Sequence, residues 1–323
     1  MKSVRRSSLT VLALIMILFP LSLKAEESGS GHYMPGASAS FVDTLPNKPG
    51  LAVGNFFAYY GGSASVSDQL FFGGFVTADM DAKAYADTVV ILYRPSLTLL
   101  GGFYATGVAI PYVWMTVKGK VQGPAPGGGT LTFKKRDTSN GIGDITLYPV
   151  MLGWTALGGD LKYDVRLGVY VPTGDYTKGD LANVGKNFWT FEPMITLSYF
   201  NKKGFELSAY TGVDFNTENH DTHYKSGDQF HADVTVAQHL PFLGNFASVG
   251  VNGFYYQQIT GDSGSGAILG DCKGRTVGIG PTLSYVTKVR RKDLVVEIKW
   301  LPELDVGNRI EGDYIWFKLA MQF

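Results

Sequence analysis

The end of the chain alternates without a break between apolar and polar positions. From the last residue backwards, every second side chain is apolar: Phe323, Met321, Leu319, Phe317 and Ile315. Gln322, Ala320, Lys318, Trp316 and Tyr314 lie between them. Successive side chains of a β-strand point to opposite faces, so a period of two predicts a strand with one apolar and one polar face.

The same alternation recurs along most of the chain. In residues 161–171 the apolar positions alternate with Lys162, Asp164 and Arg166. These patterns and the turn residues between them predict strands at 51–61, 86–98, 102–118, 142–156, 161–171, 189–200, 205–216, 229–239, 246–258, 274–287, 293–301 and 313–323.

The links between these strands alternate in length. Short turns at 99–101, 157–160, 201–204, 240–245 and 288–292 separate long loops at 62–85, 119–141, 172–188, 217–228, 259–273 and 302–312. Short turns at one rim and long loops at the other are typical of outer-membrane barrels, whereas a soluble sandwich has no reason for this alternation. We therefore predict an all-β fold: a transmembrane antiparallel up-and-down β-barrel of about twelve strands over residues 50–323.

Proline leaves the strand count open at ten, twelve or fourteen. Proline has no amide hydrogen to donate to a neighbouring strand. Each proline inside a predicted strand therefore indicates a bulge, a kink or a wrong boundary. These prolines are Pro95, Pro111, Pro149, Pro193 and Pro281.

The first 49 residues differ from the rest. A basic start (2–6) precedes an apolar run (9–23), which is typical of a secretory signal peptide, here residues 1–25, cleaved after Ala25; an uncleaved anchor is the alternative. Cleavage removes four of the 28 basic side chains and none of the 28 acidic ones, so the net charge becomes −4. Residues 26–49, rich in Gly, Ser, Ala and Pro, are predicted to be a flexible periplasmic tail or a plug in the barrel.

Membrane-barrel strands turn their apolar face to lipid and their polar face to the lumen. The predicted pore-lining residues are therefore Asp144, Lys162, Asp164, Arg166, Tyr170, Glu206, Tyr210, Asp214, His231, Asp233, Glu297, Lys299 and Lys318. They either pair with one another and stiffen the wall or form a polar pathway. About eight strands leave a filled interior and about sixteen an open channel, so about twelve predict a narrow lumen.

Candidate chemistry is sparse. His220 and His223 lie near carboxylates in loop 217–228, but we favour a solvated loop there and predict no metal site and no cofactor. Cys272 is the single cysteine, so it cannot form an internal disulfide and is predicted to be a free thiol in a loop. The charge pattern lacks the clustered basic surface that a nucleic-acid partner would need.

A catalytic reading rests on three residues of neighbouring strands. His231, Asp233 and Ser248 could meet as the site of a barrel enzyme that acts on lipids. A hydrogen-bond network in the lumen explains the same residues, and we favour it. The chain is therefore not expected to be an enzyme.

Several strand and turn fragments are similar to a known family. They lie at 31–36, 141–145, 171–176, 187–193, 214–219, 280–281 and 284–285. In these fragments, which span nearly the whole mature chain, the sequence resembles the outer-membrane proteins grouped under the meta-pathway of phenol degradation. The resemblance implies a barrel with a proposed role in passing hydrophobic or aromatic small molecules, and it implies no residue-level site.

These observations favour a channel in the bacterial outer membrane for passive or facilitated uptake of small molecules, aromatic or hydrophobic ones among them. A structural or adhesive barrel with a blocked lumen is the main alternative. The expected partners are outer-membrane lipid and lipopolysaccharide, the barrel-assembly machinery and a small-molecule solute. Phe323, Met321 and Leu319 are the expected export and assembly signal, because a terminal aromatic on the apolar face resembles the C-terminal signal of such barrels.

Overall fold

The computed structural model describes residues 27–46, 48–65, 70–124, 130–244, 246–270 and 273–323. The predicted signal peptide and Cys272 lie outside these residues. Within the described ranges, no helix has the length and apolar character to cross a membrane. Helical structure there consists of single 3-10 turns: η1 (Glu27–Gly29), η2 (Phe41–Asp43), η3 (Leu157–Gly159) and η4 (Pro241–Leu243).

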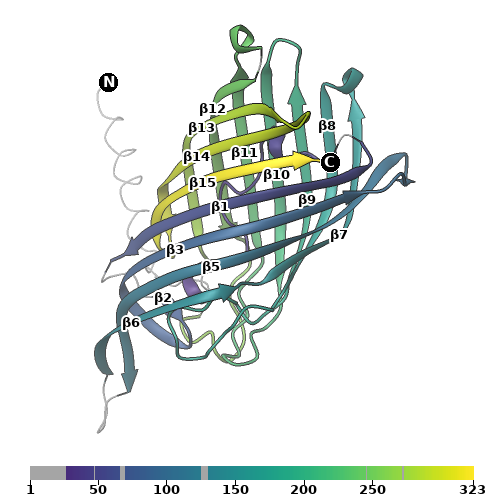
Figure 1. The fold of residues 1–323 in the computed structure, drawn as a ribbon. Coiled ribbons are helices and arrows are strands. Elements are labelled where there is room, and N and C mark those ends of the chain that lie inside the picture. Colours follow the sequence, from purple (N-terminus) through teal and green to yellow (C-terminus); the bar gives the residue numbers. More distant parts are fainter. Residues whose placement is uncertain (1–26, 47, 66–69, 125–129, 245, 271–272) are drawn as a thin grey trace, which may run out of the picture.

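Twelve strands of the described chain form a closed antiparallel barrel (Figure 1). They are β1 (Gly50–Ala64), β3 (Phe75–Arg94), β5 (Gly102–Pro124), β7 (Ile145–Ala156), β8 (Leu161–Val171), β9 (Thr190–Phe200), β10 (Phe205–Asn216), β11 (Gln229–His239), β12 (Ala247–Gln258), β13 (Arg275–Val289), β14 (Lys292–Gly307) and β15 (Glu311–Gln322). Strand β15 pairs with β1 and closes the wall. Closure leaves no unpaired strand edge in lipid.

Three shorter or peripheral strands lie beside this wall. Strand β2 (Leu70–Phe72) pairs with β3, β4 (Thr98–Leu99) with β5, and β6 (Thr130–Ile142) with the outer half of β5. The predicted fold class is thus confirmed. Several predicted boundaries are wrong, because β3 begins at residue 75 and β5 runs on to 124 and forms a hairpin with β6.

The missed strand ends have a physical explanation. In β3, Met80 and Ala82 are buried while Asp79 and Asp81 are exposed. The outward side chains are therefore charged here, unlike those of a lipid-facing strand, and the pattern resembles a polar loop. The β3, β5 and β6 ends project past the belt of apolar side chains as a long hairpin on the rim of long loops (Figure 1).

The outer surface of the barrel is apolar around its circumference. Large exposed apolar side chains occur on successive strands: Val89, Leu147, Val165, Ile195, Val234, Val251, Leu283, Ile298 and Ile315. Aromatic side chains flank this belt. Tyr112 lies beside Trp114 at one end, with the rings tilted, and Trp154 stacks on Tyr163 at the other. An apolar band between aromatic girdles is the surface that lipid requires, and the protein is located in the bacterial outer membrane.

The prolines inside predicted strands have different positions in the structure: one lies outside its strand and another lies at a bulge. Strand β3 ends at Arg94, so Pro95 lies outside it. Pro149 sits at a register shift between Leu147 and Val150, which is a bulge in β7. Proline removes one ladder hydrogen bond, and a bulge accommodates that loss without ending the strand.

The N-terminal segment, residues 27–46, passes through the lumen. At the rim of long loops, Glu27 accepts hydrogen bonds from Tyr176 and Thr222. At the opposite end, the Phe41 amide donates to Glu206, near the start of β10. Figure 1 shows this purple segment enclosed by the barrel.

Candidate functional site

The lumen is divided into a polar side and an apolar side. Strands β8 to β11, β14 and β15 turn buried charged residues inward, among them Asp164, Asp233 and Lys318. Strands β1, β3 and β5 turn mainly alanine, valine and methionine inward. Burying a charge is costly unless it is paired or hydrogen-bonded, so the polar side needs partners.

The N-terminal segment supplies many of these partners. The Tyr33 hydroxyl donates to Asp233 Oδ1 at 2.8 Å. Lys299 Nζ donates to the carbonyl oxygens of Gly36 and Ser38 at 3.1 and 2.9 Å. These contacts hold the segment against one wall of the barrel.

The inner part of the segment is held by ion pairs. Lys318 Nζ lies 2.9 Å from Asp43 Oδ1 and 3.2 Å from Glu297 Oε1, and the Lys318 side chain is fully buried. Arg166 donates to the carbonyl oxygen of Asp43 and pairs with Asp164. Breaking a buried pair leaves an uncompensated charge, so these contacts fix the segment firmly.

The outer part of the segment ends in a buried carboxyl group. Glu27 is 3% exposed and accepts hydrogen bonds from Thr222, Tyr176 and Asn219 in two long loops. Burial raises the pKa of Glu27 to about 7, although these hydrogen bonds and the charge of Lys186 act in the opposite direction. Glu27 therefore changes charge near neutral pH.

On the other side of the segment lies a cavity of about 370 Å³. It extends from Phe72 and Ile310 near the outer rim to Leu92 and Met151 towards the inner one. On strands β1, β3 and β5 its wall is formed mainly by small or apolar side chains: Ala58, Ala82, Ala84, Ala86, Val90, Ala109, Val113, Met115 and Val117. The segment closes the cavity opposite this wall, where His32, Tyr33 and Met34 border it.

The predicted pore-lining residues lie on the inner side of the wall. Lys162, Arg166 and Tyr170 are half-buried, and the others are buried: Asp144, Asp164, Glu206, Tyr210, Asp214, His231, Asp233, Glu297, Lys299 and Lys318. Among them, Asp144, Arg166 and Tyr170 also border the cavity. Their role as pore-lining residues stays a prediction.

Most of these side chains pair with one another or with the segment. Asp144 contacts His32 at 2.9 Å. Glu206 contacts His239 at 2.8 Å, and both Tyr170 and Tyr210 donate to Glu192. The polar side is thus a network that fixes the N-terminal segment.

Sequence reasoning missed the apolar wall. In β3 the inward residues Ala82, Ala84 and Ala86 alternate with Lys83 and Tyr85. A run of alanines at every second position was the available signal. It was overlooked because lumen-facing residues were expected to be polar.

The proposed catalytic trio does not assemble. Ser248 pairs in register with His239, which is eight positions from His231 and thus roughly 27 Å away along the strand. The Ser248 hydroxyl contacts Ser284 at 2.6 Å, and Asp233 is held by Tyr33. The residues do not meet because strand register, which the sequence alone did not give, places Ser248 of β12 beside the opposite end of β11 from His231 and Asp233.

The comparison with protein families gives a clear match. A family described as "Putative MetA-pathway of phenol degradation" matches residues 65–319. The chain belongs to this family. A search of curated protein sequences gave no match.

The comparison with solved structures gives one match that shows the fold and others of lower similarity. The COG4313 outer membrane channel from Pseudomonas putida F1 is 14% identical, with a TM-score of 0.61, over 90% of this chain and 100% of that one. A FadL homologue from Pseudomonas aeruginosa is 7% identical, with a TM-score of 0.41, over 85% and 90% of the two chains. The transport unit of the autotransporter AIDA-I from Escherichia coli is 9% identical, with a TM-score of 0.46, over 86% and 91%. The first of these supports the barrel fold.

Proposed function

We propose that this protein is an outer-membrane channel through which small aromatic or hydrophobic molecules pass by passive or facilitated diffusion. The main support is the divided lumen, in which the N-terminal segment plugs the polar side and an apolar cavity of about 370 Å³ follows the other side. An apolar cavity of roughly 150 Å³ already accommodates benzene. The cavity is therefore large enough for a substituted aromatic ring.

The edge of the cavity adds a polar element. Tyr148, Arg166 and Tyr170 border it beside the apolar wall. Binding sites for small molecules commonly combine an apolar lining with a few polar groups that orient the ligand. This combination suits a ring with one polar substituent, and the family description, which refers to phenol degradation, points to the same class of solute.

The experiment is an uptake assay in liposomes that contain the refolded protein. The panel comprises a toluene derivative, phenol, a sugar and an amino acid. We expect the aromatic compounds to enter faster than in protein-free liposomes, and the sugar and the amino acid to enter at the protein-free rate. Equal acceleration of all four solutes would contradict the proposed selectivity.

Two matched variants locate the path. Ala86→Trp adds an indole to the cavity wall, and Val89→Trp adds the same group on the exposed side of the same strand. We expect Ala86→Trp to reduce aromatic uptake towards the protein-free rate and Val89→Trp to leave it unchanged. Equal rates in the two variants would place the path outside this cavity.

A barrel with a blocked lumen is the competing function. The observation in its favour is the number of buried contacts that hold the N-terminal segment, including those of Asp43 and Asp233. It predicts that no solute enters faster than in protein-free liposomes. In that case the long loops would carry the function.

A further inference from the structure

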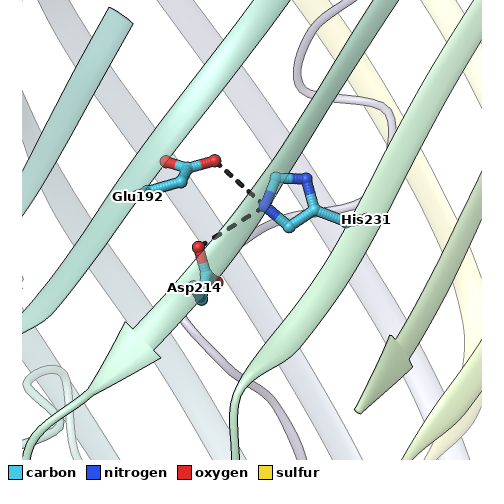
Figure 2. Close-up of side chains that lie close together, drawn as sticks. All are labelled: Glu192, Asp214 and His231. Carbon is cyan, nitrogen blue, oxygen red and sulfur yellow. Dashed lines mark ion pairs between the residues drawn. The ribbon is translucent and has the colours of Figure 1, made fainter. Parts of the chain in front are cut away.

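Three side chains of neighbouring strands converge in the lumen, as Figure 2 shows. Glu192 comes from β9, Asp214 from β10 and His231 from β11. His231 Nε2 lies 3.1 Å from Glu192 Oε1 and 3.4 Å from Asp214 Oδ1. All three side chains are at most 1% exposed.

The strand register creates a charge problem at this point. Gly212 pairs with Met194 and Phe215 with Phe191, so Asp214 lies opposite Glu192. Two carboxylates directly opposite on adjacent strands repel each other. A single imidazole faces both carboxylates and carries at most one positive charge against their two negative charges.

His231 does not resolve this charge by hydrogen bonding. Neither of its ring nitrogens makes a hydrogen bond with a described residue, although Nε2 lies close to both carboxylates. A fully buried ring nitrogen without a hydrogen bond is unusual and calls for an explanation. One ring nitrogen thus faces an oxygen atom of each carboxylate, and the three candidate ligand atoms all lie within 4.8 Å of one another.

Two glycines provide the space in which the side chains converge. A Cβ atom on Gly212 would lie 2.6 Å from His231 Cε1 and 3.3 Å from Glu192 Oε1. A Cβ atom on Gly168, which pairs with Glu192, would lie 3.1 Å from Glu192 Oε2. Any larger residue at either position would push the side chains out of this arrangement.

We propose that Glu192, Asp214 and His231 bind a divalent first-row transition-metal ion such as Zn²⁺. One imidazole nitrogen and two carboxylate oxygens are ligands that such ions accept. Ligands about 2.0–2.1 Å from a tetrahedral ion are roughly 3.3 Å apart. The two separations from His231 Nε2, 3.1 and 3.4 Å, are close to this value, and all three ligand atoms lie within 4.8 Å of one another. The charge of the ion also neutralises the two opposed carboxylates.

The position of the site gives the ion a structural role. The Tyr33 ring stacks on the His231 ring with centroids 4.0 Å apart, and the Tyr33 hydroxyl donates to Asp233 on the same strand. An ion bound to His231 ties β9, β10 and β11 together and fixes the ring on which Tyr33 rests. It therefore supports the docking of the N-terminal segment.

The test measures metal binding directly. Protein refolded in detergent is stripped with a chelator, incubated with Zn²⁺ or Co²⁺, separated from free ion and analysed for metal content. We expect one ion per chain, and Co²⁺ should give the visible absorption of a nitrogen- and oxygen-ligated ion. A wild-type protein that retains neither ion would overturn the proposal.

Two histidine variants test whether the ion is bound by this cluster. His231→Gln removes one ligand, and we expect a loss of affinity of more than about 100-fold, since even indirect partners of metal ligands contribute 10- to 100-fold. His239→Gln is the matched control, because His239 is on the same strand, equally buried, and contacts the single carboxylate of Glu206. Equal metal content in both variants would also overturn the proposal.

A third variant tests the site without removing a ligand. Gly212→Ala adds only a methyl group, but this group occupies the space of the His231 ring. We expect weakened metal binding in a barrel that still shifts its electrophoretic mobility on heating. Unchanged metal affinity in this folded variant would argue against convergence of the three side chains on one ion.

Discussion

Tyr33 donates its hydroxyl hydrogen to Asp233 at 2.8 Å, although the two residues are 200 positions apart in the chain. Asp233 Oδ1 also accepts a hydrogen bond from the Gly36 amide. One buried carboxylate thus holds two points of the N-terminal segment. Because the segment separates the apolar cavity from the charged wall, its stability decides how the lumen is divided.

The first prediction concerns this contact. Tyr33→Phe removes the hydroxyl and keeps the ring, so a buried carboxylate loses one donor, at a cost of about 1–3 kcal/mol. We expect amide hydrogen exchange in residues 31–40 to accelerate by about fivefold or more, with the barrel strands unchanged. Tyr163→Phe, on the exposed face of β8, is the control and should leave this exchange unaffected.

The second prediction concerns the ion pairs of Lys318. Lys318→Met leaves Asp43 and Glu297 buried without their shared cation, and loss of one partner of a buried pair costs about 3–5 kcal/mol. We expect a decrease of this size in the free energy of unfolding, measured by urea titration in lipid vesicles. Lys288→Met breaks an exposed pair with Asp293 and should cost less than about 1 kcal/mol. Similar losses in both variants would contradict a buried role for Lys318.

The third prediction concerns pH and Glu27. Folding raises its pKa from 4.5 to about 7 because the carboxyl group is buried, so the docked segment favours the protonated form. The stabilisation is complete below about pH 4.5 and is lost as the pH rises through about 7. We expect hydrogen exchange near residue 27, corrected for its intrinsic pH dependence, to be faster at pH 8 than at pH 5.5.

Glu27→Gln provides the control for this prediction. Glutamine keeps a hydrogen-bonding side chain of similar size but does not ionise. The variant should therefore show the same protection at both pH values. A pH dependence that persists in Glu27→Gln would assign the effect to another group.

The fourth prediction concerns assembly. Phe323 is exposed, and its amide donates to the Leu51 carbonyl at 2.7 Å, beside the closure of β15 on β1. If it is the export and assembly signal, Phe323→Asp should reduce the folded, heat-shifting form in outer-membrane fractions yet refold normally in detergent. Phe242→Asp, at another exposed aromatic in a short turn, should be normal in both assays. Failure of Phe323→Asp to refold in detergent would instead indicate a role in stability.

The sequence by itself determined the barrel. Alternation such as that of residues 161–171 specifies which side chains of a strand face lipid, and this local property needs no knowledge of neighbouring strands. The alternating link lengths then required an antiparallel wall with two different rims. Because alternation and link length are both visible in the sequence, the ends of strands β8 to β13 were predicted to within two residues.

Only the tertiary structure decided what fills the lumen. Residues 27–46 have no periodicity, and their position depends on contacts with residues more than a hundred positions away, such as Asp144 and Asp233. The convergence of Glu192, Asp214 and His231 depends on strand register and on the empty space beside Gly212. The sequence of each strand predicts which of its side chains point into the lumen. It does not predict which residues those side chains contact, because contacts across a barrel are set by strand register and closure.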